Sequence, residues 1–168
     1  INVSGQKKIK MENLRDMCQK IGFQKVQTYI QSGNIIFEST EKSIFTLEKN
    51  ISEAILQTFG FEVETLVRTV EYFQEIQNNN PFLLKDKNIA IKLLHVTFLA
   101  KSPNPELIQK LSVTNYSTEQ YEIVEDKIYL YYPDGYGKAK LHNAAFEQKL
   151  KVVATTRNWN TVINVLMC

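Results

Sequence analysis

The order in which helical and strand-like patterns follow one another is the feature that most limits the fold of this chain. From residue 91 onward the patterns run strand, helix, strand, strand, helix, strand and a final helix. Residues 11–79 show helix, strand, strand, helix, strand and one extra helix. Because βαββαβ is the order of the ferredoxin-like α/β plait, the sequence predicts an α+β protein of two such domains in tandem, each followed by a helix. We place these domains at residues 1–80 and 81–168, with the polar, proline-bearing segment NNNPFLLKDKN as the linker.

Helices are expected where apolar residues recur at helical spacing, and strands where β-branched and aromatic residues gather. Predicted helices cover residues 11–21, 43–59, 69–79, 105–111, 140–150 and 158–167. Predicted strands cover a hairpin at 25–39 and the segments 61–67, 91–100, 119–125, 127–132 and 152–155. The first half lacks the strand that a plait places before its first helix and in the centre of its sheet. We therefore expect the natural protein to have further residues upstream of Ile1.

Composition limits the classes of function. Hydrophobic residues make up 43% of the chain and charged residues 23%, as in an ordinary globular protein, and no apolar run approaches the roughly 18 residues that span a bilayer. A formal net charge of +2 does not by itself indicate nucleic-acid binding, so any anion site must be local. Cys18 and Cys168 form neither a disulfide framework nor a metal-type spacing, which favours the cytoplasm.

The segment TTRNWNT places a lone tryptophan among polar residues where the last predicted helix begins. Trp159 lies on the apolar stripe of that helix, which indicates an anchor in the core. Asn158 and Asn160 are typical helix-capping residues, whereas capping does not explain Arg157. Because a guanidinium beside the free N–H groups of a helix start favours phosphate or carboxylate, the segment has both a structural and an anion-binding interpretation.

The loop YYPDGYGKAKLHN joins a predicted strand to a predicted helix. Gly135 and Gly137 permit backbone conformations that favour a tight turn or a nest of N–H groups, and Lys138 and Lys140 add positive charge. The pattern is not a Walker A loop, because G-x-x-x-x-G-K-[ST] is absent. A tight turn is the simpler interpretation, and a phosphate-binding loop is the alternative.

A third basic loop, SGQKKIK, leads into the first predicted helix. Lys7 and Lys8 lie where backbone N–H groups and the helix dipole favour anions. Such a run is also typical of a solvated face. The three loops together make a phosphate-bearing ligand the leading hypothesis for what the protein binds.

Catalytic and metal-binding patterns are sparse. His95 lies in an apolar strand and His142 near a helix start, and neither has the histidine or cysteine partner that a metal site needs. Tyr129 and Tyr131 alternate with apolar residues, so they either stack nucleic-acid bases or lie where the exposed sheets of the two domains pack together, and the lack of an RNP pattern favours packing. No cofactor or metal is expected, and a catalytic role stays open.

Five segments taken in order resemble the bacterial family known as domain of unknown function 1697 (DUF1697): INVSGQKKIKMENLRDMCQKIGF, TYIQSGNIIF, HVTFL, YYPDGYGKAKL and ATTRNWNTV. The resemblance spans nearly the whole chain. It implies a tandem pair of ferredoxin-like plaits and a short apolar strand ahead of Ile-Asn-Val, and it implies no particular activity. The chain departs from the family at Ala139, where members usually carry a serine, so a role for a hydroxyl group there is not expected.

The residues and the resemblance together favour a cytoplasmic protein that binds a nucleotide, a nucleic acid or another phosphate-bearing ligand without catalysis. The candidate anion site consists of Arg157, Asn158, Trp159, Asn160, Lys138, Lys140, Gly135, Gly137, Lys7 and Lys8. Two alternatives stand beside this hypothesis. One is a small enzyme acting on a phosphorylated metabolite, and the other is a protein–protein interaction module in which these motifs are purely structural. No membrane association is expected.

Overall fold

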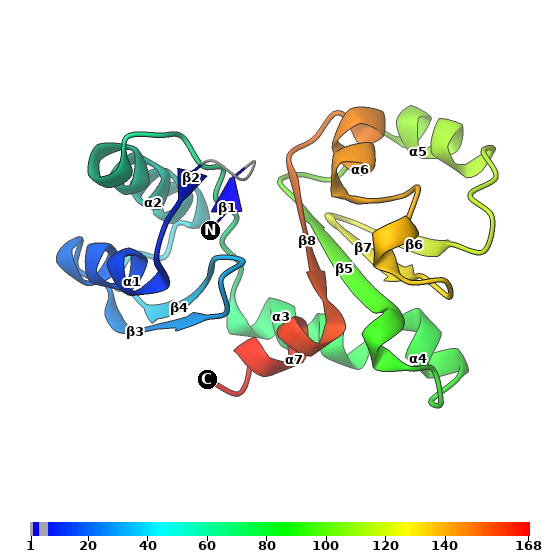
Figure 1. The fold of residues 1–168 in the computed structure, drawn as a ribbon, viewed down its shortest axis with the longest axis horizontal. Helices are drawn as coiled ribbons and strands as arrows, with labels where there is room; N and C mark the ends of the chain where they lie inside the picture. The colour runs from blue at the N-terminus through cyan, green and yellow to red at the C-terminus, as the bar shows by residue number, and fades with distance from the viewer. Residues whose placement is uncertain (1, 4–6) are drawn as a thin grey trace. The chain divides into compact units, whose positions relative to one another are not determined.

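The computed structural model describes residues 2–3 and 7–168 (Figure 1). The chain divides into two compact units, one formed by residues up to Thr69 together with Val165–Cys168 and the other by Val70–Asn164. The α+β class predicted from the sequence is confirmed. No helix among the described residues is long and apolar enough to cross a membrane.

The first unit contains helices and short antiparallel pairs of strands. Its elements are β1 (Asn2–Val3), β2 (Lys7–Lys8), α1 (Met11–Lys20), β3 (Gln24–Tyr29), β4 (Asn34–Glu38) and α2 (Ile44–Phe59). β1 pairs with β2, and β3 pairs with β4. The two predicted helices and the predicted hairpin are therefore confirmed.

Helix ends in this unit follow from local sequence signals. The Ser43 side chain accepts a hydrogen bond from the Thr46 backbone N–H at 3.2 Å and so begins α2. Gly60, with a φ of 80°, ends that helix in the left-handed conformation that glycine adopts readily. Apolar faces of the two helices and the hairpin meet in one core of Ile9, Leu14, Met17, Cys18, Phe23, Val26, Leu47, Ile51, Ala54, Ile55 and Val67.

The segment 61–67, predicted as a strand, is not a strand in the structure. Its backbone bonds to side chains of α2 instead. Ser52 Oγ donates to the Val63 carbonyl oxygen at 3.2 Å, and the Val67 N–H donates to Glu48 Oε1 at 2.9 Å. A β-rich composition predicts extended backbone, but a strand also needs a neighbouring strand with which to form a ladder, and local composition does not supply one.

The second unit is built around a four-stranded antiparallel sheet with the strand order β6-β7-β5-β8 (Figure 1). Its elements are α3 (Val70–Asn78), α4 (Pro81–Lys85), the 3₁₀ turn η1 (Ile91–Leu93), β5 (Leu94–Leu99), α5 (Pro105–Ser112), β6 (Gln120–Val124), β7 (Lys127–Tyr131), the 3₁₀ turn η2 (Tyr136–Lys138), α6 (Asn143–Leu150), β8 (Ala154–Asn158) and α7 (Trp159–Val165). The predicted βαββαβ order is thus confirmed for β5 to β8.

Both faces of this sheet are packed. Leu99 of β5 and Leu130 of β7 share a buried cluster with Phe146 of α6. On the opposite face, the ring of Phe98 lies 5.3 Å from that of Phe73 in α3, measured between ring centroids. Tyr131 similarly lies 5.9 Å from Phe82 in α4.

Tyr129, on the face covered by α3 and α4, is only 1% exposed. A base would need an accessible ring face on which to stack. Tyr129 is therefore packed and not available for stacking, but the packing partners on this face are helices of the same unit and not the second sheet that was predicted.

The segment NNNPFLLKDKN, predicted as an irregular linker, contains a helix. Asn80 Oδ1 accepts the Phe82 backbone N–H at 3.0 Å, Pro81 occupies the first turn of α4, and Phe82 is buried. An asparagine followed by proline is a capping signal, because proline fixes φ and lacks the N–H that a first turn leaves free. The compact unit that contains this helix begins at Val70, whereas the domain boundary between residues 80 and 81 stays a prediction.

Candidate functional site

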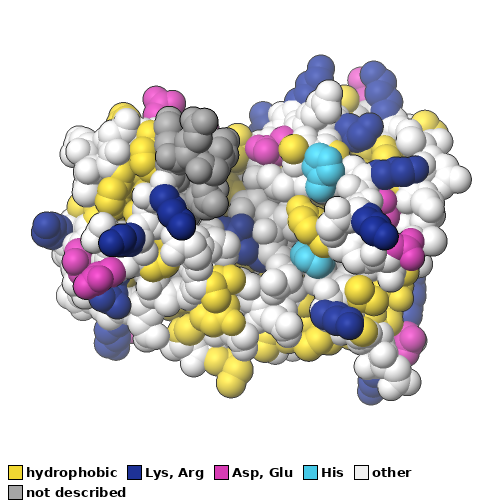
Figure 2. All heavy atoms as spheres, viewed as in Figure 1, with side chains coloured by type: hydrophobic (Ala, Val, Ile, Leu, Met, Phe, Trp, Pro, Cys, Tyr) yellow, Lys and Arg dark blue, Asp and Glu magenta, His cyan; other side chains and the backbone are white. Residues whose placement is uncertain are grey.

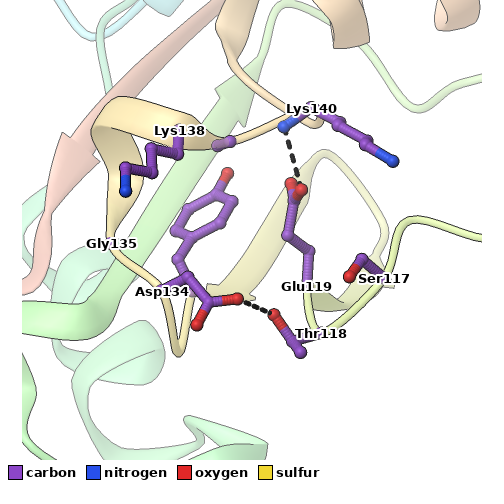
Figure 3. Close-up of a pocket in the computed structure, with 9 residues that line it drawn as sticks. Ser117, Thr118, Glu119, Asp134, Gly135, Lys138 and Lys140 are labelled. Atoms are coloured by element: carbon purple, nitrogen blue, oxygen red, sulfur yellow. Dashed lines mark hydrogen bonds between the residues drawn. The ribbon is translucent and has the colours of Figure 1, made fainter.

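A cavity of about 290 Å³ opens at one end of the four-stranded sheet, where β6 begins and β7 has ended (Figure 3). Ser117, Thr118 and Glu119 line it from the segment before β6. Tyr132, Asp134, Gly135, Lys138, Ala139 and Lys140 line it from the segment that follows β7. We call this cavity the 117–140 pocket. It brings together Lys138, Lys140 and Gly135, which the sequence analysis had placed in one loop.

The shape of the loop after β7 follows from a buried tyrosine and a glycine. Tyr132 is 1% exposed, and its hydroxyl donates to the Leu141 carbonyl oxygen, which ties the two ends of the loop together. Gly135 has a φ of 86°, and its N–H donates to the Tyr132 carbonyl oxygen at 2.9 Å. Because residues that carry a side chain rarely adopt that φ, a glycine is favoured at this turn.

Glu119 occupies a pair of neighbouring backbone N–H groups at residues 140 and 141, which lie after the two glycines suggested as a phosphate nest. Its Oε2 accepts the Lys140 N–H at 2.9 Å, and its Oε1 accepts the Leu141 N–H at 2.8 Å. The protein's own carboxylate thus fills the position at which these two N–H groups would hold an anion. This contact joins the start of β6 to the loop that leads into α6.

Asp134 faces Thr118 across the pocket (Figure 3). The Thr118 hydroxyl donates to Asp134 Oδ2, which leaves Oδ1 without a hydrogen-bond partner among the described residues. Ser117 holds its place in a turn, because its N–H donates to Asn115 Oδ1 at 2.8 Å. The pocket therefore offers two hydroxyl groups and two carboxylates in addition to its lysines.

Lys138 and Lys140 are exposed at the rim, and their side chains extend in opposite directions from the loop (Figure 3). Neither ammonium group forms an ion pair with a carboxylate of the described part of the chain. Other basic side chains are scattered over the visible face of the second unit, interspersed with neutral ones (Figure 2). The positive charge at the pocket comes from these two lysines, and the carboxylates of Glu119 and Asp134 lie beside them.

Arg157 does not lie in a turn before the last helix, as predicted, but inside β8, opposite Val96 of β5. The strand predicted at 152–155 begins only at Ala154 and continues to Asn158, because the residues that pair with β5 are 154–158. Arg157 Nη1 donates to Thr155 Oγ1 at 2.7 Å and to the Thr156 carbonyl oxygen at 3.0 Å. Burial lowers the pKa of its guanidinium.

Asn158 caps α7 as the structural interpretation of TTRNWNT expects. Its Oδ1 accepts both the Thr161 backbone N–H at 2.9 Å and the Thr161 hydroxyl at 3.0 Å. Trp159 is 2% exposed and forms part of the interior, whereas Asn160 is exposed. None of the residues 157–160 lines the 117–140 pocket.

The other predicted site residues whose side chains the structure describes do not line this pocket. Gly137 is exposed in η2 and is not among the lining residues. Lys8 is exposed in β2 of the first unit, and the side chain of Lys7 lies outside the described residues. No group of three metal-ligating side chains occurs within residues 2–3 and 7–168 that could hold an ion.

His95 is a buried polar residue that no sequence motif indicated as unusual. It is 8% exposed, stacks on Tyr136 with 4.7 Å between ring centroids, and meets Tyr132 edge to face at 5.3 Å. Its Nδ1 has no hydrogen-bond partner among the described residues. Burial lowers the pKa of this imidazole, and a hydrogen bond with the Leu93 backbone partly opposes the shift. His95 therefore supports the aromatic wall behind the loop.

Comparison with protein families matches residues 1–129 of the chain to the proteins of unknown function grouped as DUF1697. The chain belongs to the DUF1697 family. Among solved structures, it is similar to a conserved bacterial protein, SP0830 from Streptococcus pneumoniae, with 22% sequence identity and a TM-score of 0.75. The similarity covers 99% of this chain and 92% of that protein, and it concerns the fold. No curated protein gives a match.

Ser117, Thr118 and Glu119 fall inside the segment that the family matches, and the loop 132–141 lies after it. The family therefore covers one wall of the 117–140 pocket. Its description assigns no activity, so the chemistry of the pocket itself carries the functional argument.

Proposed function

We propose that this DUF1697 protein binds a small phosphate-bearing ligand in the 117–140 pocket, in a binding rather than a catalytic role. The observation that carries the proposal is the position of Lys138 and Lys140, two exposed ammonium groups at the rim of one cavity with no carboxylate partner among the described residues. Lysine side chains are long and flexible, so both can turn toward an anion that enters the cavity. Hydroxyl groups of Ser117 and Thr118 add neutral hydrogen-bonding groups beside them.

A binding role fits the hydrogen bonds of the pocket carboxylates. Glu119 holds the backbone N–H groups of residues 140 and 141, and Asp134 accepts from Thr118. A general base must instead reach a proton of the substrate in a productive pose. The two carboxylates are therefore better suited to shape the loop and to contact a ligand than to transfer protons.

The order of the strands and helices also bears on whether the two units share one fold. We infer that both units are ferredoxin-like domains, since the strand order β6-β7-β5-β8 with α5 and α6 between strands is that of a single plait. In the first unit, the succession α1-β3-β4-α2 follows the same order. The free and buried Cys18 fits the cytoplasmic location expected from the sequence.

Calorimetric titration of the full chain tests the proposed ligand class. Inorganic phosphate and phosphate-bearing metabolites are the probes, and the variants are Lys138→Ala, Lys140→Ala and their combination. We expect the double variant to lower affinity by about 10-fold, because two charged hydrogen-bond donors leave the site. Lys101→Ala and Lys110→Ala are matched controls, since both lysines are exposed in the second unit and neither lines the pocket.

Retention of wild-type affinity in the folded double variant would show that the anion binds elsewhere. Absence of binding by all probes would favour the structural alternative, in which Glu119 closes the nest permanently and the loop only supports the fold. The salt dependence gives a second readout, because binding through two lysines must weaken as ionic strength rises.

A further inference from the structure

We infer that the ligand of the 117–140 pocket is a small phosphorylated polyol or sugar, whose hydroxyl groups bond to Asp134 while the lysines hold its phosphate. This inference rests on the proposed function and specifies it. The charges of the pocket are balanced. Lys138 and Lys140 contribute two positive charges, and Glu119 and Asp134 contribute two negative ones.

A bare phosphate ion meets an unfavourable balance in such a pocket, because the carboxylates repel what the lysines attract. A ligand that also carries hydrogen-bond donors changes this balance. Ionised carboxylates accept hydrogen bonds and cannot donate them, and hydroxyl groups are donors that pair with carboxylates strongly. The mixed lining therefore selects a molecule with a phosphate at one end and hydroxyl groups at the other.

Asp134 is the carboxylate placed to receive such hydroxyl groups. Its Oδ2 is fixed by the Thr118 hydroxyl, while Oδ1 has no partner among the described residues and the side chain is exposed to the cavity. The hydrogen bond to Oδ2 fixes the carboxylate of Asp134 and so sets the direction in which Oδ1 points. Since the Thr118 hydroxyl donates its proton to Asp134, the threonine oxygen can itself accept a hydrogen bond from a second ligand hydroxyl.

Glu119 plays a different part, since each of its oxygens already accepts a backbone N–H. It keeps the nest of residues 140 and 141 occupied and so holds the phosphate out at the lysine ammonium groups. A phosphate bound by the lysines and a polyol bound by Asp134 then do not compete for the same atoms.

The size and lining of the cavity favour a polyol over a nucleotide. Its volume of about 290 Å³ is at the lower end of the range for pockets that enclose drug-sized ligands. Its aromatic side chain, Tyr132, is 1% exposed and its hydroxyl is bonded to the Leu141 carbonyl oxygen, so it offers no open face to a base. Nucleobases are usually held by stacking on such faces.

Calorimetric titration of the wild-type chain with inorganic phosphate, glycerol 3-phosphate, glucose 6-phosphate and adenosine monophosphate tests this inference. We expect at least one of the two polyol phosphates to bind about 10-fold more tightly than inorganic phosphate, because carboxylate–hydroxyl bonds add to the phosphate contacts. The affinity for adenosine monophosphate is expected to exceed that for inorganic phosphate by less than the affinity for these two polyol phosphates does.

Asp134→Asn gives the sharper result, because the two kinds of probe should respond in opposite directions. Affinity for the polyol phosphate should fall by about 10-fold with the loss of charged acceptors, whereas affinity for inorganic phosphate should rise by about 2-fold as one negative charge leaves the pocket. Asparagine can still accept from Thr118, so the loop is preserved. Asp86→Asn is the matched control, since Asp86 also accepts a hydrogen bond in an exposed turn and does not line the pocket.

Equal affinity for phosphate and both polyol phosphates would overturn the inference and leave the proposed function standing. Tighter binding of adenosine monophosphate than of either polyol phosphate would overturn it in favour of a nucleotide. If none of the four probes binds, both this inference and the proposed function are wrong. A parallel fall in affinity for every probe in Asp134→Asn would assign Asp134 to the phosphate contact and contradict its role as hydroxyl acceptor.

Discussion

The carboxylate of Glu119 accepts the backbone N–H of Leu141 at 2.8 Å, a bond between two residues that lie 22 positions apart in the chain. Leu141 is fully buried, so its N–H cannot turn to water when this acceptor is lost. Together with the bond to Lys140, it fastens the loop after β7 to the start of β6. The Glu119 side chain therefore stabilises the pocket and also occupies two N–H groups that could otherwise hold an anion.

Glu119→Ala should lower the free energy of unfolding by about 1–2 kcal/mol, the cost of leaving a buried N–H without an acceptor. Glu119→Gln should lower the free energy of unfolding by less, because the amide oxygen of glutamine can accept one of the two hydrogen bonds. Urea denaturation followed by circular dichroism measures both. The control is Glu122→Ala on β6, an exposed carboxylate that should change stability by no more than about 0.5 kcal/mol. Equal stability of Glu119→Ala and the wild type would contradict this account.

Asn158→Ala should destabilise the protein by about 1 kcal/mol, because Thr161 loses the side-chain oxygen that accepts its N–H. Asn160→Ala is the matched control on the same helix, since Asn160 is exposed and alanine favours helix. Thermal denaturation should therefore give a lower melting temperature for Asn158→Ala than for Asn160→Ala. If both variants melt at the same temperature, Asn158 does not act as a cap.

The stability of the protein should depend on pH through His95. Burial lowers the pKa of this residue in the folded chain below its ordinary 6.5. As the pH falls below that value the unfolded chain takes up a proton that the folded chain does not, so the free energy of unfolding decreases until the folded pKa is reached and then levels off. Urea denaturation between about pH 5 and 7.5 measures this slope. His95→Phe should flatten it, and an unchanged slope in that variant would place its origin in another group.

The two cysteines should react at very different rates. Burial raises the pKa of the Cys18 thiol to about 11, so it has little thiolate near neutral pH and little access to reagents. Cys168 is exposed. Peptide mass spectrometry after a short treatment with iodoacetamide should find Cys168 modified and Cys18 intact, with Cys18 reacting after denaturation. Early modification of Cys18 would show that α1 opens readily.

The spacing of apolar residues predicted most of the architecture, because it indicates which faces of the helices and strands are buried. The helices other than α4 and the strands β5 to β7 follow their apolar patterns, whereas β8 begins and ends later in the chain than its pattern predicted. The segment 61–67 has the same local character, yet it bonds to side chains of α2, since strand formation depends on a neighbour distant in sequence. The helix α4 was hidden by its proline, which in fact occupies the first helical turn.

The candidate site was predicted only in part, for a similar reason. Lys138 and Lys140 were found because they lie in one loop, beside a glycine with a positive φ. Thr118 and Glu119 were missed, because they reach this loop only through the pairing of β6 with β7. Their position at the start of the strand predicted at 119–125 was the available signal. Arg157 drew attention as a charge among capping residues, and the ladder with β5 places it in a strand instead.

The most direct test of the central claim is a titration of the ¹⁵N-labelled protein with glycerol 3-phosphate, in which backbone amide shifts report the site of binding. The account predicts saturable shifts at residues 117–119 and 134–141, reduced in the Lys138→Ala/Lys140→Ala variant and unchanged in Lys110→Ala. Saturable shifts confined to residues 157–160, or no shifts at all, would contradict it.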